Sequence, residues 1–295
     1  MPPDTGALAV TAIAEVTAQL GLREVSMLRS SGKTLMAAAD LAGRSVVVKV
    51  LLDGGGFWQA RWQHEIALYR AFASEPPPVR VPALIRTDGQ RFLVLERLDG
   101  SPLDTARYPW HRLGAAQTGP SLATLRTLSA WQPPVGRFAP VWDYSGRVAR
   151  YHAAGYLTSG DADALHRLRA RCGQQAAFGH GDPLPSNLLL TPDGGCALVD
   201  WEFGGMFLPG IDLAILHTLL GAGTPEVRTF IDQEVAGTGI EGPFAVNLAM
   251  VLTREQRIHR ELPASPERDQ HLAYLDSAWT QARDRIHTAA RNWTA

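Results

Sequence analysis

The sequence predicts an α+β chain of two lobes: a small N-terminal lobe with an antiparallel sheet plus one helix, and a larger, mainly helical C-terminal lobe. Short apolar, β-branched runs gather before residue 98, and helical periodicity dominates after residue 100. One hairpin signal interrupts the helical half near residue 190. We therefore divide the chain into residues 1–98 and 99–295.

The composition is that of a globular protein. The 295 residues are 45% hydrophobic and 19% charged, with a net charge of −1 and no long run of one sign, so nothing favours binding to nucleic acid or to an anionic membrane. No apolar stretch reaches the length of a membrane span, and the start lacks the basic segment of a secretory signal. Two cysteines make neither a disulfide framework nor a metal-ligand spacing. We expect a cytoplasmic protein with no nucleic-acid or membrane partner.

The first predicted hairpin joins residues 24–30 to residues 35–41 through Ser31-Gly32-Lys33-Thr34. If this turn lies over a nucleotide, its backbone N–H groups face the phosphates, which makes Ser31 and Gly32 candidate contacts. The Gly-Lys-Thr triplet is not a Walker A loop, because that motif needs a glycine where Met27 stands. A plain surface hairpin remains the alternative.

A lysine interrupts the next strand, predicted over residues 44–52. A buried ammonium is costly unless it is paired, so Lys49 needs an anion. The helix predicted over residues 57–73 supplies one, because Glu65 is the only charged residue of its apolar face. The economical solution is a Lys49–Glu65 ion pair, which would position the α- and β-phosphates of a nucleotide. Alternatively, Lys49 extends to the strand edge and Glu65 flanks the apolar face.

Residues 91–100 predict a strand that ends at Gly100, where the chain passes from one lobe to the other. Backbone groups of Glu96, Arg97 and Leu98 could bind a nucleotide base there. Backbone contacts leave no side-chain signature, so this placement depends on chain order alone.

A second hairpin is predicted where apolar runs 188–190 and 197–199 flank a Pro-Asp-Gly-Gly turn. Antiparallel pairing would set Asn187 opposite Asp200, with Cα atoms roughly 5 Å apart. An amide oxygen and a carboxylate are hard ligands suited to a Mg²⁺ ion that bridges nucleotide phosphates.

Asp182 can reach the same place from the preceding loop. Asp-x-x-x-x-Asn followed by a second Asp is the spacing of a phosphoryl-transfer site. Each of these residues alone would more often be a turn or cap residue. All three around one hairpin indicate phosphotransfer.

The remainder is predicted to be mainly helical, with Pro and Gly clusters between the helices. The predicted helices cover residues 121–131, 141–151, 161–171, 211–220, 246–261 and 270–292.

In this order, Lys49, Glu65, His180-Gly-Asp182, Asn187 and Asp200 resemble the aminoglycoside phosphotransferase and choline kinase-like family over roughly residues 22–220. The most specific element is His-Gly-Asp with Asn five residues later, followed by Val-Asp-Trp-Glu. The resemblance implies a protein kinase-like fold. It further implies that Asp182 orients or deprotonates the acceptor hydroxyl, and that Asn187 and Asp200 bind Mg²⁺.

The same resemblance implies supporting roles near the site. Asp212 resembles a structural aspartate that braces the catalytic loop, and His180 is assigned the same kind of support. The sequence departs from the family pattern at Pro183 and Pro185, which stiffen the loop and change the expected fit of the acceptor.

The resemblance implies an NTP-dependent O-phosphotransferase that uses ATP or GTP and acts on a small-molecule hydroxyl. Polycationic aminoglycosides call for clustered carboxylates, whereas the C-terminal helices mix both signs of charge. Trp110, Trp131 and Trp142 could serve a flatter, less charged ligand, unless they are simply core. We therefore expect as acceptor a neutral or modestly charged natural product, such as an antibiotic, rather than a classical aminoglycoside. Glu202 either contacts this acceptor or caps the following turn.

Two other functions stay open. One is a metabolic kinase of a sugar, amino alcohol or amino acid derivative. The other is a non-catalytic nucleotide-binding protein, which the presence of every catalytic residue disfavours.

Overall fold

The computed structural model describes residues 5–293, and the chain divides into two compact units. The N-terminal unit comprises the chain up to Ser101 together with Ala197–Phe203, and the helical unit comprises Pro102–Cys196 and the chain from Gly204 onward. Each unit has its own core, and we describe each by itself.

The N-terminal unit is built on a five-stranded antiparallel sheet in the order β1-β2-β3-β5-β4. Because side chains alternate along β3, Val46, Val48 and Val50 bury one face while Lys49 lies on the other. The strands are β1 (Arg23–Ser30), β2 (Thr34–Leu41), β3 (Arg44–Leu51), β4 (Leu84–Thr87) and β5 (Phe92–Glu96).

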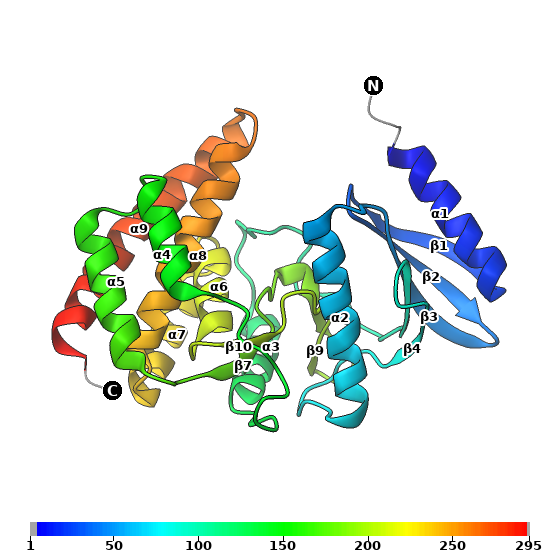
Figure 1. Ribbon diagram of the computed structural model, residues 1–295, viewed down its shortest axis with the longest axis horizontal. Helices are drawn as coiled ribbons and strands as arrows, with labels where there is room; N and C mark the ends of the chain where they lie inside the picture. The colour runs from blue at the N-terminus through cyan, green and yellow to red at the C-terminus, as the bar shows by residue number, and fades with distance from the viewer. Residues whose placement is uncertain (1–4, 294–295) are drawn as a thin grey trace. The chain divides into compact units, whose positions relative to one another are not determined.

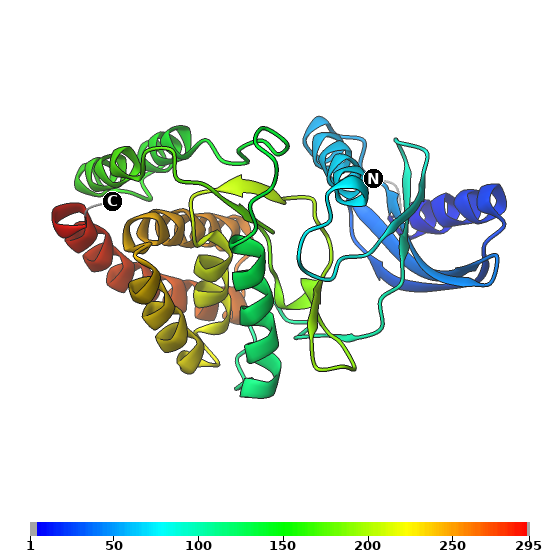
Figure 2. The same cartoon turned by 90° about the horizontal axis from the view of Figure 1, so that it is seen from below.

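Two helices cover the two faces of this sheet, as Figures 1 and 2 show. Helix α1 (Thr5–Leu20), which the sequence analysis did not predict, contributes Ile13 and Val16 to the core that contains the β3 valines. Helix α2 (Gly56–Ser74) lies on the opposite face and buries Glu65 within its apolar stripe.

The helical unit packs around α8 (Glu241–Glu261), which contacts α4, α5, α6, α7 and α9. Its other helices are α3 (Ala115–Ser129), α4 (Tyr144–Ala153), α5 (Ser159–Cys172), α6 (Ile211–Leu220), α7 (Pro225–Thr238) and α9 (Pro266–Asn292). The described chain contains no helix long and apolar enough to cross a bilayer.

Among the helices of this unit, three differ most from the prediction. α7 was missed, α8 begins at Glu241 instead of residue 246, and α3 covers residues 115–129 instead of 121–131. Pro120 lies inside α3, and the sequence rules that treat proline as a boundary placed the helix start after it.

Short strands carry the loops of interest. β7 (Ala177–Gly179) pairs antiparallel with β10 (Gly205–Phe207). The amide of Leu103, just after β6 (Ser101–Pro102), donates to the carbonyl of Leu188 in β8 (Leu188–Leu190) at 2.7 Å. β9 is Cys196–Leu198, one residue earlier than predicted. A hydrogen bond of 3.0 Å from Thr191 N to Gly195 O closes the turn that follows β8.

Candidate active site

Lys49 is held between two carboxylates within the N-terminal unit. Its Nζ lies 2.7 Å from Glu65 Oε2 and 2.6 Å from Asp200 Oδ1, and its side chain is only 4% exposed. The ammonium therefore does not extend to the strand edge. The pair with Glu65 is the one that the sequence predicted, whereas the contact with Asp200 was not foreseen.

These charges shift one another's pKa values. Burial lowers the pKa of Lys49, but the charges of Asp200 and Glu65 more than offset that effect, so its pKa lies above the ordinary value. Burial raises the pKa of Glu65 to about 7, although the charge of Lys49 opposes this. Glu65 Oε1 has no hydrogen-bond partner among the described residues. Of the two carboxylates, Glu65 is thus the one poorly solvated as an anion.

Asp200 reaches Lys49 because its segment joins the N-terminal unit. Leu198 N donates to Arg80 O at 3.0 Å, and the buried ring of Trp201 packs edge-on against Phe72 with centroids 4.9 Å apart. Asp200 itself has φ of 67°, in the left-handed region that Asp tolerates better than most residues. Such a backbone costs about 1 kcal/mol or more, and anchored neighbours on both sides maintain it.

The second lysine also binds an acid of this segment. Lys33 Nζ lies 2.6 Å from Glu202 Oε1 and 4.2 Å from the ring centroid of Trp58. The Glu202 carboxylate therefore has a partner on the β1–β2 turn, and its contact with an acceptor stays a prediction. Within the turn, Ser31 Oγ accepts from Thr34 N at 3.1 Å, and a Cβ at Gly32 would meet no atom within 4 Å.

The predicted base-binding segment begins at the end of β5. Glu96 N donates to Ala83 O at 2.9 Å, and Arg97 N donates to Ser45 O at 3.4 Å. The side chain of Glu96 also accepts from Arg80. Because two of the three amide donors are engaged, Leu98 is the residue whose amide best fits the predicted contact with a base.

In the helical unit, Asp212 holds the loop that carries Asp182. The amides of His180 and Gly181 donate to the two oxygens of its carboxylate, each at 2.8 Å. Asp212 is buried, and burial raises its pKa although the charge of His180 opposes this. His180 is fully buried, and its Nδ1 lies 3.3 Å from Asp182 N. The bracing contacts that the resemblance implied are thus present.

Asn187 closes the same loop. It ends a short 3₁₀ helix that begins at Pro185, and its Nδ2 donates to Asp182 O at 3.0 Å. This bond uses the amide donor, so Oδ1 is the atom that remains suited to a cation. Asn187 and Asp200 belong to different units, and their convergence on one Mg²⁺ stays a prediction.

The sequence analysis missed a charged cluster beside Asp182. Glu255 of α8 is fully buried and accepts from Arg107 (2.9 and 2.7 Å), Tyr108 Oη (2.8 Å) and Arg254 Nε (3.1 Å). Burial alone would raise its pKa, but the charges of Arg107 and Arg254 lower it to about 2. Arg254 in turn places Nη2 3.6 Å from Asp182 Oδ1. Sequence showed these residues only as mixed charges on a helix, because Arg107 lies far away along the chain.

Two of the tryptophans considered as ligand contacts are packing residues. Trp131 stacks edge-on against Phe178 at 4.9 Å, and Trp142, 7% exposed, packs against Phe207 at 5.5 Å. Trp110 remains 40% exposed.

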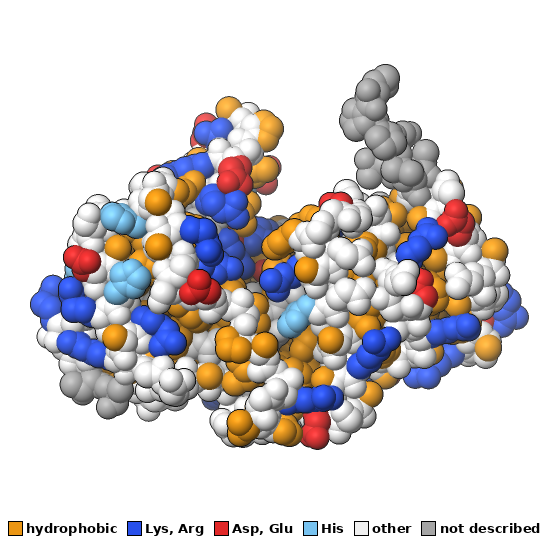
Figure 3. All heavy atoms as spheres, viewed as in Figure 1, with side chains coloured by type: hydrophobic (Ala, Val, Ile, Leu, Met, Phe, Trp, Pro, Cys, Tyr) orange, Lys and Arg blue, Asp and Glu red, His pale blue; other side chains and the backbone are white. Residues whose placement is uncertain are grey.

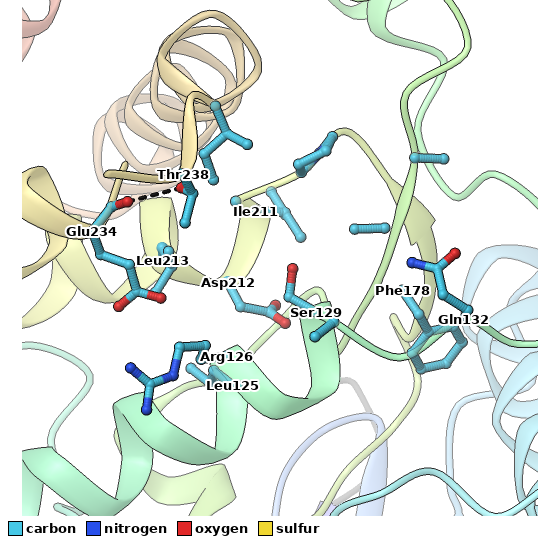
Figure 4. A pocket seen from close by; sticks show the side chains of 16 residues that line it. Leu125, Arg126, Ser129, Gln132, Phe178, Ile211, Asp212, Leu213, Glu234 and Thr238 are labelled. Atoms are coloured by element: carbon cyan, nitrogen blue, oxygen red, sulfur yellow. Dashed lines mark hydrogen bonds between the residues drawn. The ribbon is translucent and has the colours of Figure 1, made fainter. Parts of the chain in front are cut away.

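Asp212 also lines a cavity of about 280 Å³ within the helical unit. Figure 4 shows its carboxylate beside Ser129 of α3, with Glu234 and Thr238 of α7 farther along the wall. Among the predicted site residues, only Asp212 reaches this cavity.

The sequence model of the phosphotransferase enzyme family matches residues 38–285, which include every polar residue placed above from Lys49 to Glu255. The chain belongs to this family. The family resemblance drawn from its motifs is therefore confirmed. Comparison with curated proteins gives no significant match.

Solved structures of the family share the fold. The crystal structure of aminoglycoside phosphotransferase APH(4)-Ia is 14% identical, covers 96% of this chain and 98% of its own, and superposes with a TM-score of 0.56. The gentamicin complex of APH(2'')-IIa is 14% identical, covers 94% of this chain and 97% of its own, and superposes with a TM-score of 0.58. ADP-bound APH(2'')-Ib is 13% identical, covers 94% of this chain and 98% of its own, and has a TM-score of 0.58. At these identities the similarity shows the two-lobed, kinase-like fold that the sequence predicted.

Proposed function

We propose that this phosphotransferase moves the γ-phosphoryl group of ATP or GTP to a hydroxyl of a small molecule. The observation that carries the proposal is the buried Lys49 ammonium, held by Glu65 from α2 and Asp200 from the segment after β9. Phosphoryl transfer needs a fixed cation for the donor phosphates. Family structures contain ADP in one case and GDP in another, which supports both donors.

Mg²⁺ fits the residues that would hold it. Asn187 offers Oδ1 because its amide nitrogen is engaged, and Asp200 offers a carboxylate that is 22% exposed. Both are hard oxygen donors of the kind that Mg²⁺ prefers. The bound ion would neutralise charge on the phosphate oxygens.

The remaining roles follow from the contacts of each residue. Lys49 binds the α- and β-phosphates, and Glu65 keeps its ammonium in place. Asp182 aligns the acceptor hydroxyl and accepts its proton as the oxygen attacks the γ-phosphorus and the bond to the β-phosphate oxygen breaks. Asp212 keeps this loop in position through the amides of His180 and Gly181.

The first acceptor class is a hydroxylated antibiotic or related natural product, inactivated by phosphorylation. Solved relatives hold hygromycin B and gentamicin, which supports antibiotics as a class. A metabolic kinase of a sugar, amino alcohol or amino acid derivative is the second candidate. We place the enzyme in the cytoplasm, where nucleoside triphosphates are made.

Substitution of Asp182 by Asn tests the assignment. We expect transfer from ATP or GTP, screened against hydroxylated antibiotics and metabolites, to fall by about a thousandfold or more in kcat, because the variant neither orients nor deprotonates the acceptor. Nucleotide affinity should stay unchanged. Asp163→Asn, at an exposed position on α5, is the matched control and should match the wild type. Near-full transfer by Asp182→Asn would contradict the proposal.

A further inference from the structure

Arg254 keeps one donor unused beside the catalytic loop. Its Nε is bonded to Glu255 Oε1 at 3.1 Å, but its Nη2 is buried and has no hydrogen-bond partner among the described residues. Asp182 Oδ1 lies 3.6 Å from this Nη2, which is close enough for charge attraction but too far for a hydrogen bond. Buried donors are nearly always paired, so this one points to a partner that is not part of the chain.

Arg147 of α4 also lacks an anion. It is half-buried, its guanidinium lies 4.2 Å from the ring centroid of Trp142, and no carboxylate of the described chain lies within ion-pair distance. Helix α4, which carries Arg147, packs against α8, which carries Arg254, so both guanidinium groups belong to one helix pair. Burial lowers the pKa of Arg147, and the charge of Arg254 acts in the same direction. A half-buried arginine next to another cation is costly unless an anion joins them.

The balance of charge here is positive. Arg107, Arg147 and Arg254 share two carboxylates, Glu255 and Asp182, and Glu255 is already saturated by hydrogen bonds. Figure 3 shows Lys and Arg side chains gathered over the region of α4 and α8. An acceptor rich in ammonium groups would meet repulsion at this place, whereas an oxyanion would pair with both arginines.

We propose that Arg147 and Arg254 form an oxyanion subsite for the acceptor, which therefore carries a carboxylate or phosphate group close to the hydroxyl that is phosphorylated. This rests on the proposed function, because Asp182 places the hydroxyl. A hydroxyl bonded to Asp182 Oδ1 and an oxyanion bonded to Arg254 Nη2 lie at most about 9 Å from each other, a span that a small molecule can bridge. The acceptor is thus a hydroxylated acid.

The subsite can be tested without knowledge of the acceptor. Malonate, malonamide and 1,3-diaminopropane are similar in size but are negatively charged, neutral and positively charged, respectively. Each is titrated calorimetrically into the full chain without nucleotide or Mg²⁺. We expect malonate alone to bind, and Arg147→Gln and Arg254→Gln each to weaken it by roughly tenfold or more. Arg150→Gln on α4 and Arg260→Gln on α8 are matched controls at exposed positions and should bind as the wild type does. Absent malonate binding, or equal binding by all variants, overturns the inference.

A conservative variant distinguishes a loss of charge from a loss of folding as the cause of weaker malonate binding. Arg254→Lys keeps the positive charge and should recover part of the malonate affinity that Arg254→Gln loses, at a similar thermal midpoint. If Arg254→Lys recovers none of it although it is folded, the charge is not what binds the anion and the proposal fails.

Nucleotide binding distinguishes this inference from the proposed function. Arg254→Gln should bind ADP with Mg²⁺ within about twofold of the wild type, and a loss near tenfold would assign the arginine to the donor phosphates instead. If the wild type binds malonate but no nucleotide, the proposed function fails while the anion subsite stands. If it binds nucleotide but no malonate, the subsite alone fails. An acceptor identified by the panel screen that lacks any oxyanion also overturns the inference.

Discussion

Lys49 illustrates how one residue can be predicted from sequence while its full environment cannot. A charged residue inside an apolar strand must be paired, and Glu65 lies on the following helix, so the first pair is readable from local periodicity. The contact with Asp200 joins positions 151 residues apart in sequence. No local pattern predicts such a contact, and the motif around Asp200 indicated only a metal ligand.

The buried Glu255 cluster gives the molecule a measurable dependence of stability on pH. Arg107 and Arg254 hold the folded-state pKa of Glu255 at about 2, below its ordinary value of 4.5. The unfolded chain binds this proton more readily, so the stabilisation is fully present above pH 4.5 and is lost as the pH falls towards 2.

We therefore expect Glu255→Gln to lower the free energy of unfolding by about 3 kcal/mol at pH 7, because two arginines lose their buried partner. The difference from the wild type should shrink below pH 4.5, since the unfolded wild-type chain then binds a proton at Glu255 that the native protein takes up only near pH 2. Urea unfolding between pH 3 and 7 measures both effects. A difference that stays constant over this range would show that Glu255 contributes through packing and not through its charge.

At the scale of elements, the two faces of the β1–β5 sheet have separate tasks. Strand alternation buries Val46, Val48 and Val50 against α1 and leaves Lys49 on the face that α2 covers. Because α1 anchors β3 by apolar contacts on one face of the sheet, the Lys49–Glu65 ion pair can occupy the other face.

Packing of α1 should therefore contribute directly to the stability of this sheet. Ile13→Ala removes a side chain that is 8% exposed and should cost about 2 kcal/mol or more. Val10, 66% exposed on the same helix, is the matched control, and Val10→Ala should change stability by less than about 0.5 kcal/mol. Chemical denaturation of the two variants gives the comparison. Equal effects would mean that α1 is not packed as the structure shows.

Sequence patterns predicted most elements but missed two helices for identifiable reasons. α1 and α7 carry mixed residues whose helical faces become clear only once the surfaces that they cover are known. β3 and α2 were predicted because a buried strand and a one-sided apolar stripe have strong periodicity. Their bounds agree with the prediction within a few residues.

At the scale of the whole molecule, a short segment late in the sequence packs with the N-terminal unit. Ala197–Phe203 groups with residues up to 101, although its neighbours on both sides belong to the helical unit. Domain prediction by position along the chain assigns a segment to the lobe around it. Only the contacts of Leu198 and Trp201 show the return.

Because residues 197–203 belong to the N-terminal unit, they should share its pattern of amide hydrogen exchange. In mild denaturant, amides of residues 197–203 should become exposed together with those of β3 and α2, because these segments share one core. Amides of β7 and β10, which pair with each other within the helical unit, should follow that unit and serve as the internal control. Mass spectrometry of short peptides resolves the two sets. Residues 197–203 opening with β7 and β10 would contradict the division into units.

Both lysines of the chain, Lys33 and Lys49, lie in ion pairs with the segment that follows β9. Apart from the α-amino group, the 295 residues offer no other primary amine. Because the Lys49 ammonium is buried and its pKa is raised, acylating or aldehyde reagents should modify Lys33, whose side chain is 31% exposed, far faster than Lys49. Among the side chains, coupling to an amine-reactive support would therefore occur through Lys33 on the β1–β2 turn, and its rate would report on the ion pair with Glu202.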